Sequence, residues 1–100
     1  MKPLKELDPL LHSQLRLSII SILVSVSEAE FSFLKEKTKA TAGNLSVQIS
    51  KLQEAEYISV NKMFRDNKPL TTCKITRKGI KSFEEYVNII KDYLIIPKTK

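Results

Sequence analysis

The residue pattern changes abruptly at Tyr57, and this change constrains the fold more than any other feature of the chain. Up to Ala55 the apolar residues recur at steps of three and four, which is typical of helices. After it, two short runs, YISVNKMF and LTTCKIT, are rich in β-branched and aromatic residues. They are separated by RDNKP, whose Asp66, Asn67 and Pro69 favour a turn. The pattern predicts one antiparallel hairpin in an otherwise helical chain.

The part before the hairpin divides into three expected helices. Ser13 is a good N-cap for a first helix that runs to about Val26 and is apolar nearly all round, so we expect it at the centre of the fold. Ser32 is expected to cap a short second helix, FLKEKTKA, and Thr41 a third helix at about residues 42–55. The short connection KAT leaves these two helices close together at a steep angle, as in a helix-turn-helix.

A long fourth helix is expected after the hairpin, at about residues 77–95, with Thr76 as its cap. The order is then helix, helix, helix, strand, strand, helix. This order predicts a mainly α protein with a small β-hairpin wing, an α+β winged helix-turn-helix. With 100 residues and 42% hydrophobic content, we expect one domain over residues 1–100.

The chain resembles small winged-helix transcriptional regulators related to the MarR and ArsR groups in three stretches. These stretches are LDPLLHSQLRLSIISIL, GNLSVQISKLQEAEYI and TTCKITRKG. The resemblance implies a homodimer that binds duplex DNA and controls transcription. Members commonly have Gly where this chain has Glu56, so the helix must end in another geometry or hold Glu56 in a left-handed conformation. Metal-sensing relatives use Cys or His clusters, whereas Cys73 and His12 stand alone here, so we expect no metal site and no cofactor.

The outer face of the expected third helix carries mostly short side chains and a single charge, which is unusual for a helix facing solvent. Leu45, Ile49 and Leu52 mark its inner face. A helix that enters the major groove needs short residues for close approach, polar groups for base edges and apolar contacts for thymine methyl groups. Asn44 and Gln48 can offer paired donor and acceptor groups to adenine. The predicted DNA-contacting residues of this helix are Thr41, Gly43, Asn44, Ser46, Val47, Gln48, Ser50 and Lys51.

Positive charge is concentrated on the hairpin and the residues after it. Between Asn61 and Lys81 there are seven basic residues and one acid, a surplus that equals the net charge of +6 of the whole chain. We expect the wing, at about residues 64–70, to place Arg65 and Lys68 on the minor groove or on phosphates. The alternative is that the lysines only keep an exposed edge strand from aggregating.

The last expected helix carries an apolar stripe that one small wing cannot cover. Its C-terminal half extends beyond the other elements, so we predict a two-fold dimer interface there. Such a dimer places two recognition helices about 34 Å apart, and the space between paired first and last helices leaves room for an unknown small-molecule effector. The predicted dimer residues are Ile80, Phe83, Val87, Ile90 and Leu94.

Other functions find little support. The N-terminus lacks the features of a signal peptide, and the most apolar segment, residues 15–26, is too short to span a bilayer, so we expect a cytoplasmic protein. No residue pattern points to catalysis. Two alternatives stay open: a winged-helix module for protein–protein contact without specific DNA readout, and peripheral attachment to an anionic membrane. Both predict that substitutions of Asn44, Val47 and Gln48 have little effect.

Overall fold

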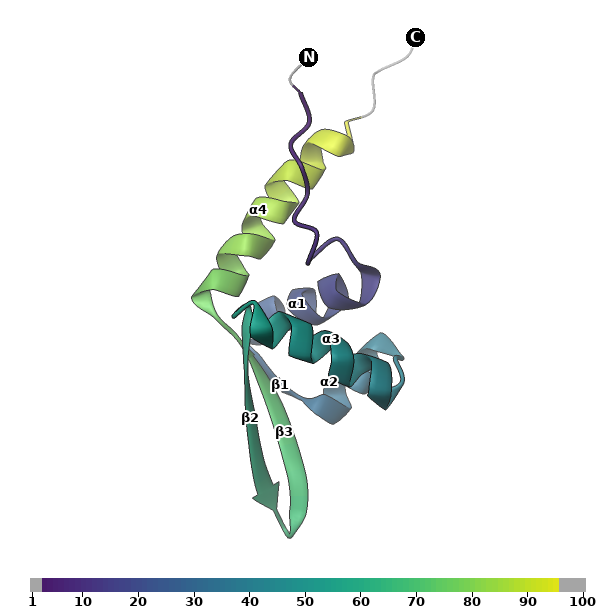
Figure 1. Ribbon diagram of the computed structural model, residues 1–100, viewed down its shortest axis with the longest axis vertical. Coiled ribbons are helices and arrows are strands. Elements are labelled where there is room, and N and C mark those ends of the chain that lie inside the picture. The colour runs from purple at the N-terminus through teal and green to yellow at the C-terminus, as the bar shows by residue number, and fades with distance from the viewer. Residues whose placement is uncertain (1–2, 96–100) are drawn as a thin grey trace.

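The computed structural model describes residues 3–95 and contains four helices and a three-stranded antiparallel sheet (Figure 1). The winged helix-turn-helix expected from the sequence is the fold that this arrangement forms. The elements in chain order are α1 (Gln14–Val26), β1 (Glu28–Glu30), α2 (Phe31–Thr38), α3 (Ala42–Glu54), β2 (Ile58–Arg65), β3 (Lys68–Ile75) and α4 (Arg77–Tyr93).

Three helices begin where side-chain caps were expected. Ser13, Thr41 and Thr76 have extended backbone conformations, and the side-chain oxygen of each accepts a hydrogen bond from the backbone N–H three residues further on. Each cap therefore satisfies one of the donors that the first turn of a helix leaves free. The predicted starts of α1, α3 and α4 are confirmed.

The strand β1 was not expected, and it changes the start of α2. It pairs with β3, with Ala29 opposite Cys73, so the sheet order is β1-β3-β2. Three residues are too few to show alternation, which is why no sequence pattern predicts this strand. Because Glu30 is still paired in the sheet, α2 begins directly at Phe31 and has no side-chain cap. The prediction that Ser32 caps this helix is wrong, since Ser32 lies inside its first turn.

The hairpin turn is shorter than the RDNKP connection expected from sequence, because Arg65 and Lys68 belong to the strands and Pro69 is paired with Phe64. Asp66 and Asn67 connect β2 to β3, and both have positive φ angles, 52° and 62°. Two successive residues with positive φ make a turn whose twist matches that of the flanking strands. Asp and Asn tolerate this conformation better than other residues with a Cβ because their short polar side chains bond locally. Pairing begins at Ile58 opposite Ile75 and ends at Arg65 opposite Lys68.

Helix α1 lies at the centre of the protein, as expected from its apolar composition. It contacts α2, α3, α4, β1 and β3, and its Ile19, Ile20 and Leu23 are fully buried. The rest of the core is contributed by single residues or small groups from every other element. These residues are Leu11, Ala29, Leu34, Leu45, Ile49, Leu52, Ile58, Cys73, Ile75 and Tyr86.

The molecule is elongated because two elements project from this core. The hairpin β2–β3 extends in one direction and α4 in the other (Figure 1), giving extents of 63 × 25 × 21 Å. The N-terminal segment runs beside α4, where Nδ1 of His12 lies 3.1 Å from the Tyr86 hydroxyl and the Tyr93 hydroxyl donates to the Lys5 carbonyl over 2.6 Å. No helix within residues 3–95 is long and apolar enough to cross a membrane.

Candidate nucleic-acid interface

The outer face of α3 is open to solvent. Leu45, Ile49 and Leu52 turn inward and are buried, which fixes the opposite side of the helix as its surface. Val47 leaves 51% of its surface exposed, although a β-branched apolar residue gains nothing from water. Of the eight residues predicted to contact DNA, Gln48 is half-buried and the other seven are exposed: Thr41, Gly43, Asn44, Ser46, Val47, Ser50 and Lys51.

Two amide side chains on this face are already hydrogen-bonded to protein groups. Oε1 of Gln48 accepts a 2.6 Å hydrogen bond from Nη1 of Arg16 in α1. Nε2 of Gln48 in turn donates to Oδ1 of Asn44 over 3.1 Å. The sequence interpretation treated both amides as free to pair with adenine, and it did not include Arg16. No local sequence signal could have found this contact, because Arg16 and Gln48 are 32 residues apart.

The C-terminal end of α3 shows how the chain replaces the glycine common in the family it resembles. Glu56 adopts the left-handed conformation, with φ of 66°. Its N–H donates to the Gln53 carbonyl over 2.9 Å, and the N–H of Tyr57 donates to the Leu52 carbonyl over 3.0 Å. This pair of hydrogen bonds is the Schellman motif, which normally has Gly at the left-handed position. Of the two geometries expected for this position, the left-handed one is confirmed.

Thr76 links the end of α3 to the start of α4. Its hydroxyl oxygen lies 2.7 Å from the Glu56 carbonyl oxygen and 2.9 Å from that of Tyr57, and it accepts a 3.0 Å hydrogen bond from the N–H of Gly79. The hydroxyl of Tyr57 donates to the Asp8 carboxylate, and burial together with this bond raises the pKa of Tyr57. The base of the wing is therefore fixed to both α4 and the N-terminal segment.

The positive charges of the wing and of the first turns of α4 all face solvent. Arg65, however, has an acidic neighbour: its Nη1 lies 3.8 Å from Oε2 of Glu30. The two side chains are 65% and 42% exposed, and a pair so exposed contributes little energy, so the guanidinium can exchange this partner for a phosphate. The seven exposed basic residues are Lys62, Arg65, Lys68, Lys74, Arg77, Lys78 and Lys81.

A large aromatic residue near the wing tip was missed from sequence. Phe64 is 77% exposed and pairs across the hairpin with Pro69. It lies on the same face of β2 as Ile58 and Val60, but Lys62 interrupts the apolar alternation between them. The hairpin extends past the core (Figure 1). Exposed apolar side chains on wings and arms can insert into a minor groove, so Phe64 belongs to the candidate interface.

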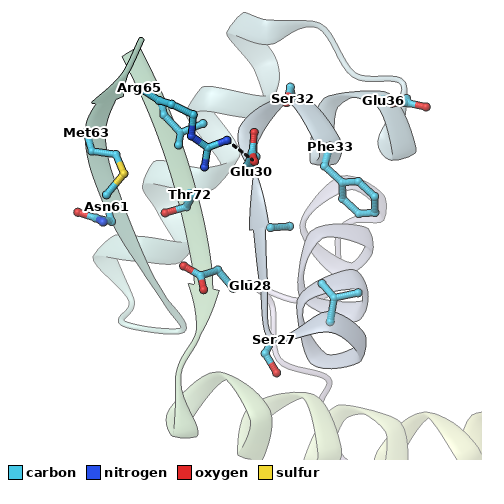
Figure 2. Close-up of a pocket in the computed structure, with 13 residues that line it drawn as sticks. Ser27, Glu28, Glu30, Ser32, Phe33, Glu36, Asn61, Met63, Arg65 and Thr72 are labelled. Carbon is cyan, nitrogen blue, oxygen red and sulfur yellow. Dashed lines mark ion pairs between the residues drawn. The ribbon is translucent and has the colours of Figure 1, made fainter. Parts of the chain in front are cut away.

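A groove of about 930 Å³ lies between the sheet and α2. Figure 2 shows Glu28 and Glu30 on the β1 side, Met63 and Arg65 on the hairpin side, and Phe33 on the α2 side. With Glu36 it is lined by three carboxylates, although the chain as a whole is basic. Carboxylates repel DNA phosphates, so the groove itself does not suit DNA, although Arg65, which also lines it, is one of the exposed basic residues of the wing.

The lone cysteine is buried in the core, and the lone histidine is exposed and hydrogen-bonded. Cys73 is fully buried opposite Ala29, and burial raises the pKa of its thiol to about 11, so the reactive thiolate is suppressed. His12 bonds to the hydroxyl of Tyr86. Within residues 3–95 no three His, Cys, Asp or Glu side chains come together in a way that could hold a metal ion.

The apolar stripe of α4 is poorly covered. Tyr86 and Gly79 are the buried residues of this helix, and the stripe residues are not among them. Ile80 is 36% exposed and Leu94 is 67% exposed, while Phe83, Val87 and Ile90 are half-buried. Phe83 and Ile90 pack against the core with part of their surface, and the C-terminal half of α4 extends away from the other helices (Figure 1).

The fold, the open face of α3 and the basic wing together define a winged-helix DNA-binding protein. The family described as winged helix DNA-binding domain matches residues 15–94, and the chain belongs to this family. Solved structures with the same fold include one described as a transcriptional regulator homologue and one described as MarR.

Three proteins illustrate the similarity. An uncharacterized protein of Methanocaldococcus jannaschii is 34% identical over 76 residues, which cover 76% of this chain and 83% of that protein. The structure of a transcriptional regulator homologue from Pyrococcus horikoshii OT3 is 26% identical, with a TM-score of 0.79 over 85% of this chain and 84% of that one. The oxidized form of MarR from E. coli shares the fold at 19% identity, with a TM-score of 0.68 over 86% of this chain and 60% of that one.

Proposed function

We propose that this protein is a homodimeric transcriptional regulator that binds specific sequences in duplex DNA. The observation that carries the proposal is the pairing of two surfaces. One is the exposed face of α3, with short side chains and a half-exposed Val47. The other is the wing with its exposed basic residues. The first suits close approach to base edges in the major groove, and the second suits the phosphate backbone beside it.

The residues of α3 divide into two roles. Thr41 and Gly43 stand at the helix N-terminus, whose free backbone N–H groups attract a phosphate. Asn44 and Val47 face outward one turn apart and are placed to contact base edges and a thymine methyl group. The predicted contacts to bases from Ser46 and Ser50, and to phosphate or guanine from Lys51, rest on the same exposed face.

The wing supplies contacts that do not depend on sequence. Lys68 and Arg65 are the last cross-strand pair before the turn, so both reach the outer end of the hairpin. Phosphate contacts from these side chains would hold the protein on DNA of any sequence, and Phe64 beside them adds an apolar contact to the neighbouring groove.

Dimerisation is proposed from the surface of α4. The apolar stripe of this helix is incompletely covered: Ile80 and Leu94 are exposed, and Phe83, Val87 and Ile90 are half-buried. Burying the stripe against a second copy would stabilise it. Closed two-fold symmetry would present two α3 helices to one face of the duplex.

Selection of bound duplexes from a random pool, with the mass of each complex measured, tests this function. We expect enrichment of a palindrome whose half-sites are centred about 10 base pairs apart, bound by two chains. A protein that retains duplexes without enriching any sequence would contradict specific readout. One that retains no duplex at all would favour the protein–protein module instead.

A further inference from the structure

Arg16 is held rigidly between the N-terminal segment and α3. Its Nε–H donates to the carbonyl of Leu10 over 2.6 Å, and its Nη1–H donates to Oε1 of Gln48, also over 2.6 Å. Both Arg16 and Gln48 are half-buried. A planar guanidinium bonded at two of its nitrogens cannot rotate without breaking one of the bonds, so the position of the group that faces α3 is fixed.

The fixed guanidinium sets the direction of two amides in turn. Arginine has donors and no acceptor, so Gln48 must turn its carbonyl oxygen toward Arg16. The amino group of Gln48 then points the other way, toward Asn44, and donates to Oδ1 over 3.1 Å. Asn44 must therefore use its carbonyl oxygen for this bond. The orientation of an exposed amide on α3 is determined by a charged group on α1.

The consequence is that Asn44 presents its amino group outward. Among the hydrogen bonds of residues 3–95, Nδ2 of Asn44 has no partner, and the side chain is exposed on the outer face of α3. In the major groove, guanine offers two acceptors, O6 and N7, whereas thymine offers a single acceptor, O4, adenine offers one acceptor and one donor, and cytosine offers a donor. An outward amino group with two N–H donors is complementary to guanine.

We propose that Arg16 is a positioning residue that determines specificity: acting through Gln48, it orients the amide of Asn44 so that α3 selects guanine. The proposal rests on the function proposed above, in which α3 reads DNA. It also replaces adenine, expected from the sequence, as the base that Asn44 reads. Arg16 itself touches no base in this account.

The test is selection from random duplexes with wild type and four variants. Asn44→Ala identifies the position that Asn44 reads, as the one whose preference disappears. Arg16→Lys keeps the charge but cannot bond to both partners. Lys91→Arg is its control, because it makes the reverse exchange at an exposed residue in the last turn of α4, outside the proposed DNA surface. Gln48→Glu keeps an acceptor for Arg16 but has no donor for Asn44, so Asn44 must turn its amino group inward and present its oxygen.

We expect wild type and Lys91→Arg to prefer guanine at this position by roughly fivefold or more over the other bases. Arg16→Lys should reduce the ratio to near one. Gln48→Glu should change the preferred base to one with a donor in the major groove, cytosine or adenine. Thermal melts verify that each variant is folded, and the base preference of Gln48→Glu still tests the proposal if Arg16→Lys is destabilised.

Three results would overturn the proposal. The first is a wild type that enriches a clear site with a base other than guanine at the Asn44 position. The second is an Arg16→Lys variant that keeps the wild-type ratio, and the third is a Gln48→Glu variant that keeps guanine. In each case specific DNA binding stands and the role of Arg16 fails. A wild type that enriches no base at any position removes the proposed function as well, which distinguishes the two failures.

Discussion

Gly79, in the first turn of α4, lies against the backbone carbonyl of Tyr57 so closely that a Cβ added to it would stand 2.2 Å from the carbonyl oxygen. A second atom, Cδ1 of Ile75, would be 2.8 Å away. The carbonyl cannot move freely, because it also accepts the N–H of Thr76 over 3.1 Å. This contact fixes where the last helix leaves the wing, and no other residue fits it.

Gly79→Ala should therefore lower the free energy of unfolding by about 1–3 kcal/mol, the usual cost of forcing extra atoms into a packed site. Gly43→Ala is the matched control, since a Cβ there meets nothing within 4 Å, and it should leave stability unchanged or raise it by up to about 1 kcal/mol. Urea unfolding measures both. Equal effects of the two substitutions would show that the close contact has no energetic importance.

Glu56→Gly should stabilise the protein. A side chain at φ of 66° is strained, whereas glycine adopts this conformation freely, so removing the side chain should gain about 1 kcal/mol despite the greater flexibility of glycine in the unfolded chain. Glu54→Gly is the control, because Glu54 is the last residue of α3 with a helical backbone and the same change there should cost up to about 1 kcal/mol. A loss of stability in Glu56→Gly would mean that the Glu56 side chain makes a compensating contact.

The thiol of Cys73 should be protected in the native protein. At pH 8 its reaction with a thiol reagent should be at least about 100-fold slower than in urea, because a pKa raised from 9.0 to about 11 reduces the thiolate fraction by that factor before access is considered. The raised pKa also favours folding, an effect fully present below pH 9 and lost as the pH rises to about 11. Rapid labelling without denaturant would contradict the buried position.

Leu94→Glu should weaken the proposed dimer without unfolding the protomer, since Leu94 is 67% exposed and contributes little to the core. Sedimentation equilibrium should show a dimer for wild type and a shift toward monomer for the variant. Lys91→Glu is the control, because Lys91 is exposed on the same helix but lies outside the apolar stripe. A monomeric wild type would refute this use of α4.

The elements with strong local signals were predictable from sequence, and those determined by tertiary contacts were not. The caps Ser13, Thr41 and Thr76 each bond to a backbone N–H only three residues further along the chain. The local sequence was therefore sufficient to predict where these helices begin. The strand β1 exists only because β3 pairs with it, and three residues carry no period of their own.

The candidate interface divides in the same way. The open face of α3 followed from helical spacing, because the buried residues of the helix determine which side is left for solvent. The hydrogen bond between Arg16 and Gln48 and the exposure of Phe64 depend on how distant segments pack and on where the core ends.

The central claim is tested most directly by a titration at several salt concentrations. Wild type, Asn44→Ala and Lys68→Ala are each titrated against a selected duplex and a scrambled one. We predict that Asn44→Ala loses about 1–3 kcal/mol of binding free energy on the selected duplex only. Lys68→Ala should weaken binding to both duplexes and reduce the salt slope by about 0.9 for each lost phosphate contact. If the two substitutions affect both duplexes equally, α3 does not read bases and the account is wrong.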